Sequence, residues 1–227
     1  MDNYSFSIRH YVRLPPACQM DPLVSSISLV IVGDMLGEPL PVELMNTVTV
    51  ADGRIRDELA GDEQAAVWLG AVADRIRTEL GPAGDPVRRF AAEPLRELRD
   101  ALRRLAAETT ADPRPPATAP ELTRPQAVAT LNALARAQPQ LVWPTGGDPA
   151  RSYRMDSTSG PAVELIALQG VELFTGPGRE LLRPCLAPNC LLFFAKDHGR
   201  REWCSPACGN RARVARHYQR RQRARQG

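Results

Sequence analysis

The sequence predicts an α+β protein, in which a small antiparallel sheet packs against helices and a small cysteine-rich module with a basic C-terminal helix follows. Three observations favour this fold class. Two segments near the start of the chain are rich in β-branched residues, several later segments have apolar residues at helical spacing, and four of the five cysteines fall within residues 185–208. The chain of 227 residues, 43% of them apolar and 24% charged, is long enough to bury one or two hydrophobic cores.

No segment of the sequence has the length and apolarity of a membrane span. The longest stretches without a charged residue, 22–33 and 184–195, contain 12 residues each, whereas a spanning helix needs about 20 apolar residues. Arg9 and Arg13 precede a short apolar patch at 27–32, but no small-residue cleavage site follows that patch. We therefore expect a cytoplasmic protein that does not associate with a membrane.

The two ends of the chain differ in charge. Residues 179–227 hold 12 basic and 3 acidic side chains, whereas the preceding 178 residues hold 17 basic and 23 acidic ones. The net charges of +9 and −6 predict that the C-terminal part binds a polyanion and that the preceding part does not.

The first elements are predicted to be strands. Residues 26–32 and 42–50 are rich in β-branched side chains, and Gly37, Pro39 and Pro41 lie between the two segments. This pattern predicts two strands joined by a turn.

Two amphipathic helices are predicted next. The first spans 62–80, with Asp62 as its N-cap and Gly81 at its end, and the second spans 94–109, where leucines form a stripe on one face. Acidic residues alternate with the arginines of the second helix, which favours a solvated, salt-bridged face over a nucleic-acid site. These arginines are Arg96, Arg99, Arg103 and Arg104.

A proline-rich connector at 112–120 separates these helices from a third one. Thr123 and Gln126 fit a capping box at the start of the third helix, which we expect to end before Pro139.

Two short strands, 141–143 and 152–155, are predicted around a turn at 146–148. A fourth helix follows from Pro161 to about Phe174. The Gly-Pro-Gly sequence at 176–178 ends this helix and marks the predicted domain boundary. The chain is therefore divided into an N-terminal extension, 1–25, an α+β domain, 26–178, and a C-terminal module, 179–227.

The cysteines form two closely spaced pairs. Cys185 and Cys190 are five residues apart, Cys204 and Cys208 are four apart, and 13 residues separate the pairs. In a reducing compartment this spacing is typical of one structural zinc ion held by four thiolates, which leave no open position for a catalytic water. Unpaired buried thiols or a redox pair are the alternative, but a redox role would use one pair and leave the other idle. Cys18 lies far away and is interpreted as a lone thiol.

The insert between the pairs predicts a hairpin. Residues 191–195 and 200–203 are expected to form two strands around a turn that contains His198. Ser205 is a suitable N-cap for a helix that begins at Pro206 and runs toward Arg225. A treble clef and a zinc ribbon both remain compatible with this pattern.

Two parts of the sequence resemble known families. The C-terminal motifs resemble the CGNR zinc-finger family; they are Cys185-x4-Cys190, Phe193-Phe194, Arg201-x-Trp203-Cys204-Ser205 and Cys208-Gly209-Asn210-Arg211. The segments 42–47, 57–59, 68–69 and 131–134 are similar to the ABATE domain that usually precedes this finger. The resemblance implies a bacterial, stress-induced transcription regulator with a DNA-binding finger. The first 25 residues and the sequence Ala195-Lys196-Asp197 depart from the family pattern.

The predicted C-terminal helix is rich in arginine and has no acidic residue. Arg213, Arg216, Arg220 and Arg223 step by 3, 4 and 3 residues and therefore share one face. A phosphate backbone would relieve their mutual repulsion, so we expect this face to bind nucleic acid; the alternative is a solvated tail. Arg211 is a further candidate DNA contact.

Residues around the last two cysteines have two candidate roles. Asn210 and Arg211 either contact bases or brace the zinc site, and we favour bracing because both lie within one helical turn of Cys208. Ser205 is expected to support the same site as the N-cap residue.

The sequence shows no signature of catalysis. It has no Gly-rich phosphate loop, nucleophile elbow or His–Glu metal motif, and none of the three histidines has a nucleophile at useful spacing. We therefore expect no enzymatic activity. Asn46 and Thr47 either line a small-molecule pocket or cap the end of a strand.

The sequence hypothesis is a cytoplasmic DNA-binding regulator in which one structural zinc folds the finger and the finger presents the arginine-rich helix to duplex DNA. The preceding domain is expected to sense a small-molecule effector or to form a homodimer, because a lone small finger makes few contacts. The alternatives are a zinc module that binds RNA or an acidic protein, and an enzyme tethered to nucleic acid by the finger.

Overall fold

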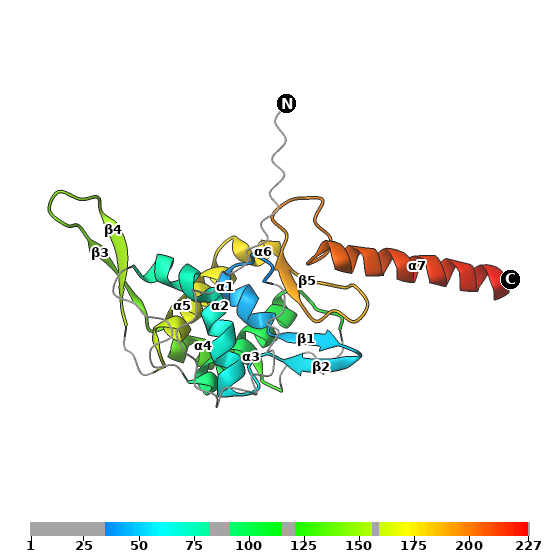
Figure 1. Cartoon of the computed structure of the whole chain (residues 1–227), viewed down its shortest axis with the longest axis horizontal. Coiled ribbons are helices and arrows are strands. Elements are labelled where there is room, and N and C mark those ends of the chain that lie inside the picture. The colour runs from blue at the N-terminus through cyan, green and yellow to red at the C-terminus, as the bar shows by residue number, and fades with distance from the viewer. Residues whose placement is uncertain (1–34, 82–90, 115–120, 156–158, 227) are drawn as a thin grey trace, which may run out of the picture. The chain divides into compact units, whose positions relative to one another are not determined.

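A computed structural model of the chain describes residues 35–81, 91–114, 121–155 and 159–226. Helices dominate the part before the cysteines: α1 (Leu40–Met45), α2 (Asp62–Leu80), α3 (Ala92–Thr109), α4 (Arg124–Leu134) and α5 (Pro161–Thr175), followed by the short α6 (Gly178–Leu181). Helix α3 is central, because it packs against α1, α2, α4 and α5 (Figure 1). All described residues belong to one compact unit.

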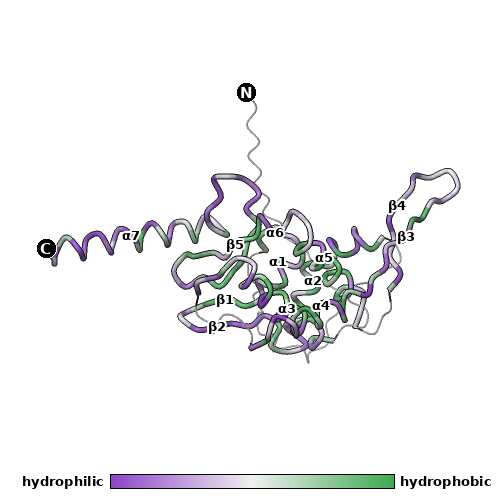
Figure 2. The backbone as a smooth tube through the Cα atoms, turned by 180° about the vertical axis from the view of Figure 1, so that it is seen from behind, coloured by the Kyte–Doolittle hydropathy of each residue, from purple (hydrophilic) through white to green (hydrophobic). Residues whose placement is uncertain are grey.

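One hydrophobic core holds these helices together. Its members are buried apolar side chains from every helix from α1 to α5, which include Leu44, Trp68, Leu98, Leu131 and Ile166. Helices α3, α4 and α5 approach closely at Gly170, where an added Cβ would lie 2.8 Å from Leu102 Cδ2. In Figure 2 this region is largely green, whereas purple stretches dominate the C-terminal helix.

The predicted strand at 42–50 is wrong in its first half. Residues Leu40–Met45 form α1, and only then does strand β1 (Val48–Ala51) begin. Pro41 lies in the first turn of the helix, where its missing amide would have had no intrahelical partner, and all six residues of α1 are buried. An element buried on every side shows no amphipathic period, so an apolar run of this kind does not distinguish helix from strand.

Strand β1 pairs antiparallel with β2 (Arg54–Asp57), in the register Val48 to Asp57. Asp52 and Gly53, both at positive φ, form the two-residue turn between them. The strand predicted at 26–32 lies outside the described residues.

Three predicted helices are confirmed with small shifts. Helix α2 ends at Leu80 as predicted and begins at Asp62, with Gly61 rather than Asp62 at the N-cap position. Helix α3 begins at Ala92, two residues earlier than predicted, and α5 ends at Thr175. The capping box of Thr123 and Gln126 is present at the start of α4.

Helix α4 ends before Pro139, as predicted, whereas the strands that follow differ from the prediction. Helix α4 ends at Leu134, and Pro139 lies within strand β3 (Gln138–Val142). Strand β3 pairs antiparallel with β4 (Ala150–Arg154) in a two-stranded ribbon whose β3 residues are all exposed. Both strands begin earlier along the chain than predicted.

The solvated face predicted for the second helix is wrong for two arginines. Arg99 and Arg103 are only 5% and 2% exposed. Arg99 forms ion pairs with Asp57 and Asp100, whose side chains are 33% and 35% exposed, so the arginine is buried while its acidic partners stay partly in solvent. The spacing of residues along α3 shows which acidic and basic side chains are neighbours. It does not show the carbonyl groups of other elements, which accept hydrogen bonds from a buried guanidinium and offset its desolvation.

The C-terminal module consists of β5 (Leu182–Pro184), β6 (Phe193–Ala195) and α7 (Pro206–Gln226). Strand β6 pairs antiparallel with β5, whereas the sequence predicted pairing with residues 200–203, which contain no strand. Arg201 explains the difference, because its side chain donates to the Ala195 carbonyl at 3.0 Å and packs over Phe194. Side-chain contacts therefore hold residues 200–203 where ladder hydrogen bonds were expected.

Among the described residues, no helix combines the length and the apolarity that crossing a membrane requires.

We expect Gly170→Val to destabilise the protein by about 1–3 kcal/mol, because the new side chain overpacks the contact of α5 with Leu102 and Leu131. Gly70→Val is the matched control, since Gly70 lies on the exposed face of α2 with open space around its Cα, and should change stability by no more than about 1 kcal/mol. Urea unfolding of the zinc-loaded proteins measures both. Equal free energies of unfolding for the two variants would contradict this packing.

Candidate metal centre and basic helix

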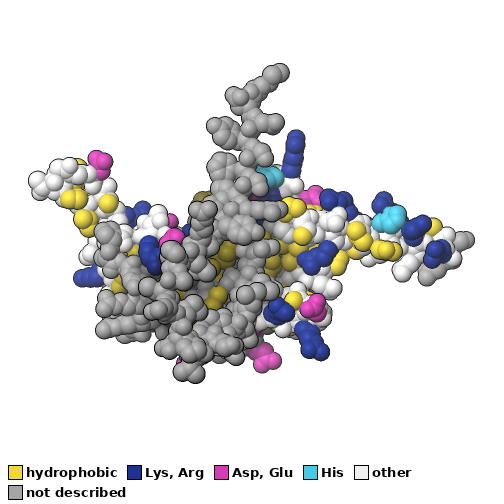
Figure 3. All heavy atoms as spheres, in the orientation of Figure 1, with side chains coloured by type: hydrophobic (Ala, Val, Ile, Leu, Met, Phe, Trp, Pro, Cys, Tyr) yellow, Lys and Arg dark blue, Asp and Glu magenta, His cyan; other side chains and the backbone are white. Residues whose placement is uncertain are grey.

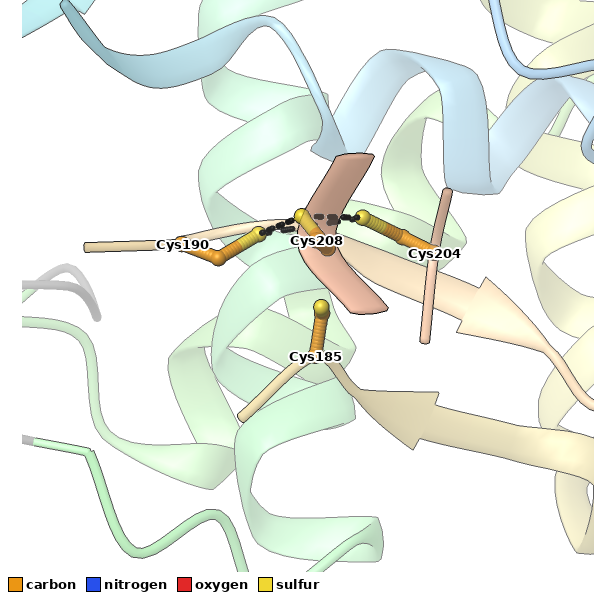
Figure 4. A group of neighbouring side chains, drawn as sticks. All are labelled: Cys185, Cys190, Cys204 and Cys208. Carbon is orange, nitrogen blue, oxygen red and sulfur yellow. Dashed lines mark hydrogen bonds between the residues drawn. The ribbon is translucent and has the colours of Figure 1, made fainter. Parts of the chain in front are cut away.

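The four cysteines converge on one point although 22 residues lie between the first and the last. Figure 4 shows their sulfur atoms facing one another, from the ends of β5 and its loop, from the segment before α7, and from α7 itself. The Sγ–Sγ distances are 3.8 Å between Cys190 and Cys204, 3.4 Å between Cys204 and Cys208, and 3.7 Å between Cys208 and Cys190. All four sulfurs lie within 4.8 Å of one another, and all four residues are buried.

Local backbone structure places each pair. Cys185 follows β5, and its amide donates to the Leu192 carbonyl at 2.9 Å. The turn before Cys190 contains Asn189 at φ 57°, and the Cys190 amide donates to Ala187. Cys208 is the third residue of α7, so its sulfur lies at the positive end of the helix dipole.

The donor set fits one zinc ion. A tetrahedron with Zn–S bonds of about 2.3 Å has S–S edges of about 3.8 Å, close to the distances among Cys190, Cys204 and Cys208. Four thiolates fill the coordination sphere of Zn²⁺, so the site is structural. Because Cys208 comes from the first turn of a helix, the module follows a treble-clef arrangement rather than that of a zinc ribbon.

Hydrogen bonds among the sulfurs explain why the cluster needs a cation. Donation from Cys190 and Cys204 lowers the pKa of Cys185 to about 2, and the pKa of Cys190 rises to about 12 because its thiol donates to Cys185. The pKa of Cys204 is raised for the same reason. Four buried thiolates would repel one another without a cation, so zinc binding compensates the charge that the loss of their protons creates.

Neighbouring side chains support the cluster. The Arg211 Nη2 donates to Cys208 Sγ at 2.9 Å, and Ser205 Oγ accepts from the Cys208 amide at 3.3 Å, the N-cap interaction that the sequence predicts. Asn210 is exposed on the first turn of α7. Arg211 is thus placed to stabilise a thiolate, as expected of a residue that braces the site.

Comparisons with known families agree with this geometry. The model of the ABATE family, described as "Putative stress-induced transcription regulator", matches residues 38–177. The chain belongs to the ABATE family. The CGNR zinc finger model matches residues 182–221, which contain all four cysteines. No curated protein matches the chain. The described molecule is therefore a member of a regulator family with an ABATE domain and a CGNR finger that holds one zinc.

The finger packs directly on the ABATE domain. Leu182 and Phe193 belong to the main hydrophobic core, whereas Phe194 packs with the cysteines. Asn46, for which the sequence leaves a pocket or a strand cap open, instead follows α1 and pairs with the backbone of Phe193, donating to its carbonyl at 2.9 Å and accepting from its amide at 2.8 Å. Thr47 Oγ1 donates to the Leu44 carbonyl.

Four side chains of the ABATE domain make contacts with the finger that the sequence does not predict. They are those of Glu38, Asn46, Arg103 and Arg114, which all bind finger backbone or Arg201. No spacing rule connects residues about 80 to 160 positions apart, and only the polar character of Glu38 and Asn46 beside an apolar run marked them as unusual.

Helix α7 carries the predicted arginine face on its surface. The four arginines at 213, 216, 220 and 223 are exposed, as is Arg211, while Cys208 and Ala212 are buried on another side. Val214 and Tyr218 are 47% and 61% exposed. In Figure 3 dark blue side chains gather along this helix.

A groove of about 650 Å³ opens where α7 begins. Arg213 lines it together with Arg200, His198 and Trp203. Trp203 lies against Gly209, where a Cβ would come within 3.1 Å of the indole Cδ1. The arginine face of α7 is therefore continuous with a concave surface whose lining combines three arginines, an aromatic ring and the acidic residues Asp197 and Glu202.

Replacing any one of the four cluster cysteines by Ser should abolish stoichiometric zinc binding, because three thiolates no longer complete the tetrahedron. Elemental analysis of the purified protein should give one zinc per chain for the unmodified chain and for Cys18→Ser, the control. Zinc affinity should fall as the pH is lowered, since protons compete for the thiolates. A full zinc load in Cys204→Ser would contradict the assignment.

We expect Arg211→Met to lower the zinc affinity by about 10-fold or more, because it removes the hydrogen bond to Cys208 Sγ while keeping the volume of the side chain. Arg221→Met, on the exposed part of the same helix, makes the same change in charge and should leave the affinity unchanged. Competition with a chromophoric chelator compares the two variants. Equal affinities would remove Arg211 from the zinc site.

Proposed function

We propose that the chain is a cytoplasmic DNA-binding transcription regulator whose zinc finger presents the arginine face of α7 to duplex DNA. One observation carries the proposal: four exposed arginines lie on one face of a 21-residue helix that contains no acidic residue. In the described part of the chain, none of these four arginines forms an ion pair. The description of the matching family, a transcription regulator, supports the same function.

The two arginine-rich helices of the chain differ in the surroundings of their arginines, which indicates a structural role in α3 and a binding role in α7. In α3, Arg99 and Arg103 are buried against carboxylates and carbonyl groups of the protein. In α7, the corresponding cations face solvent and repel one another. Phosphate groups would remove this repulsion and release counterions, which is a large share of the free energy of DNA binding.

Duplex DNA suits the shape of α7 better than duplex RNA does. A helix of 21 residues is about 30 Å long, and the major groove of B-DNA is wide enough to admit an α-helix. The major groove of A-form RNA is too narrow for such a contact. The guanidinium fork of arginine pairs with phosphate oxygens or with the O6 and N7 atoms of guanine.

The ABATE domain has the sensing or assembly role in this proposal. A cleft of about 390 Å³ lies among α1, α2, β4 and α5, lined by Arg75, Arg151, Tyr153 and Gln169 among others, and offers polar groups to a small effector. Two linked fingers would bind DNA more tightly than one, so the regulator is proposed to act as a homodimer. No catalytic step forms part of the proposal.

The decisive experiment replaces Arg213, Arg216, Arg220 and Arg223 by Ala in the zinc-loaded full-length protein. Retention of fragmented genomic DNA, followed by sequencing, measures binding across all sequences at once. We expect the variant to lose DNA binding while it keeps one zinc per chain. The slope of log K against log salt concentration should become shallower by about 0.9 for each phosphate group that the variant no longer neutralises.

A matched control replaces four exposed arginines of the ABATE domain that lie outside the proposed effector cleft, Arg54, Arg56, Arg77 and Arg154, and so makes the same change in net charge. This control should retain DNA binding. Discrete sites that only the α7 variant loses would establish a sequence-specific regulator. DNA binding that survives in the α7 variant would refute the role of this face, and retention of RNA or of acidic proteins alone would favour the alternative module.

A further inference from the structure

Three side chains of the ABATE domain hold four consecutive residues of the finger, 190–193. Arg114 Nη1 donates to the carbonyls of Cys190 and Leu192 at 3.2 and 3.1 Å. Arg103 donates to the Leu191 carbonyl at 3.4 Å, and Asn46 pairs with both the amide and the carbonyl of Phe193. Every residue of this segment, which we call the clamped segment, is therefore bound by the ABATE domain.

Two of these three side chains, those of Arg103 and Arg114, are buried cations. Arg103 is 2% exposed, and the side chain of Arg114 is 9% exposed beside the carboxylate of Asp112, at 2.6 Å. Both guanidinium groups also lie near the ring of Phe193, with Cζ 5.5 and 4.6 Å from its centroid. Burial lowers the pKa of Arg103 to about 10. Buried cations are costly without acceptors, so the carbonyls of the clamped segment stabilise the ABATE domain as well as the finger.

The clamped segment also positions two zinc ligands. It contains Cys190, and its Leu192 carbonyl accepts from the amide of Cys185. A displacement of this segment would thus move one ligand of the zinc directly and a second one through the backbone hydrogen bond.

The other pair of ligands has a separate contact with the ABATE domain. Glu38, only 2% exposed, accepts from the Ala195 amide at 2.9 Å and forms an ion pair with Arg201. Arg201 in turn donates to the Cys204 carbonyl at 3.2 Å. Both cysteine pairs are therefore connected to side chains of the ABATE domain through one or two hydrogen bonds.

We propose that the ABATE domain sets the zinc affinity of the finger through Arg114, Arg103, Asn46 and Glu38, and that zinc binding in turn orders the parts of the ABATE domain that hold the finger. Hydrogen bonds that orient metal ligands change metal affinity by about 10–100-fold when they are removed. Because such coupling is reciprocal, a disturbance of the ABATE domain by mutation or by a ligand would lower the zinc affinity of the finger. This coupling involves the metal alone and does not depend on nucleic-acid binding.

The first test compares Arg114→Met with Arg96→Met in the full-length protein. Both substitutions remove one guanidinium group and leave a side chain of similar volume. Arg96, however, donates to a carbonyl within the ABATE domain, that of Leu59, at 3.0 Å. We expect Arg114→Met to lower zinc affinity by about 10-fold or more and Arg96→Met to leave it within about twofold, measured by competition with a chromophoric chelator. Asn46→Ala is the second variant if Arg114→Met does not fold.

The second test measures the reverse direction. Hydrogen exchange of the full chain, zinc-loaded and after zinc removal, should show faster exchange on removal in α1 and in the C-terminal half of α3, with α2 changed least. The proposal is overturned if the folded clamp variants bind zinc as tightly as the Arg96→Met control, or if zinc removal affects exchange only in residues 182–226. Either result would make the finger an independent module.

Discussion

The backbone of residues 190–193 has two sets of partners to satisfy at once. On one side it contains Cys190, whose sulfur belongs to a cluster with Sγ–Sγ distances of 3.4–3.8 Å to Cys204 and Cys208 and between these two. On the other side its carbonyls receive guanidinium groups that have left water. A short two-stranded hairpin is only marginally stable in water by itself. Alone it would hold neither the cysteine sulfurs nor the carbonyl acceptors of the guanidinium groups in fixed positions. Strand β6 is held in place from both sides, and α7 is held in turn through Cys208.

Arginine has opposite roles in the two halves of this molecule. Helix α3 directs guanidinium groups inward, where fixed carbonyl and carboxylate acceptors replace water. Helix α7 directs them outward, with Gly209 and Ala212 as small residues near the zinc site and arginines beyond. The difference lies in the tertiary surroundings, because both helices are arginine-rich and both have small or apolar residues on another face.

The sequence predicts best those features that depend on interactions between residues close together in the chain. The end of α2, the capping box at Thr123, the N-cap at Ser205 and the cysteine pairs all depend on groups within a few positions of one another, and the structure confirms them. The prediction fails where distant groups decide. Helix α1 is buried on all sides and lacks an amphipathic period, and β6 pairs with β5, whereas Arg201 contacts β6 through its side chain. The pairing of Asn46 with Phe193 spans 147 positions, and no local pattern contains it.

The β3–β4 ribbon has a further consequence, which concerns strand addition. Its first strand is exposed throughout and is followed by an exposed Trp143, so an open edge of this kind invites other chains to add a strand. Pro139 lies within that strand, opposite Tyr153, and has no amide to offer to an incoming strand. The proline thus interrupts the row of donors that edge-to-edge aggregation requires. The exposed leucine and tryptophan side chains remain available for contacts through their faces, and of the two edges of the ribbon only that of β3 contains a proline.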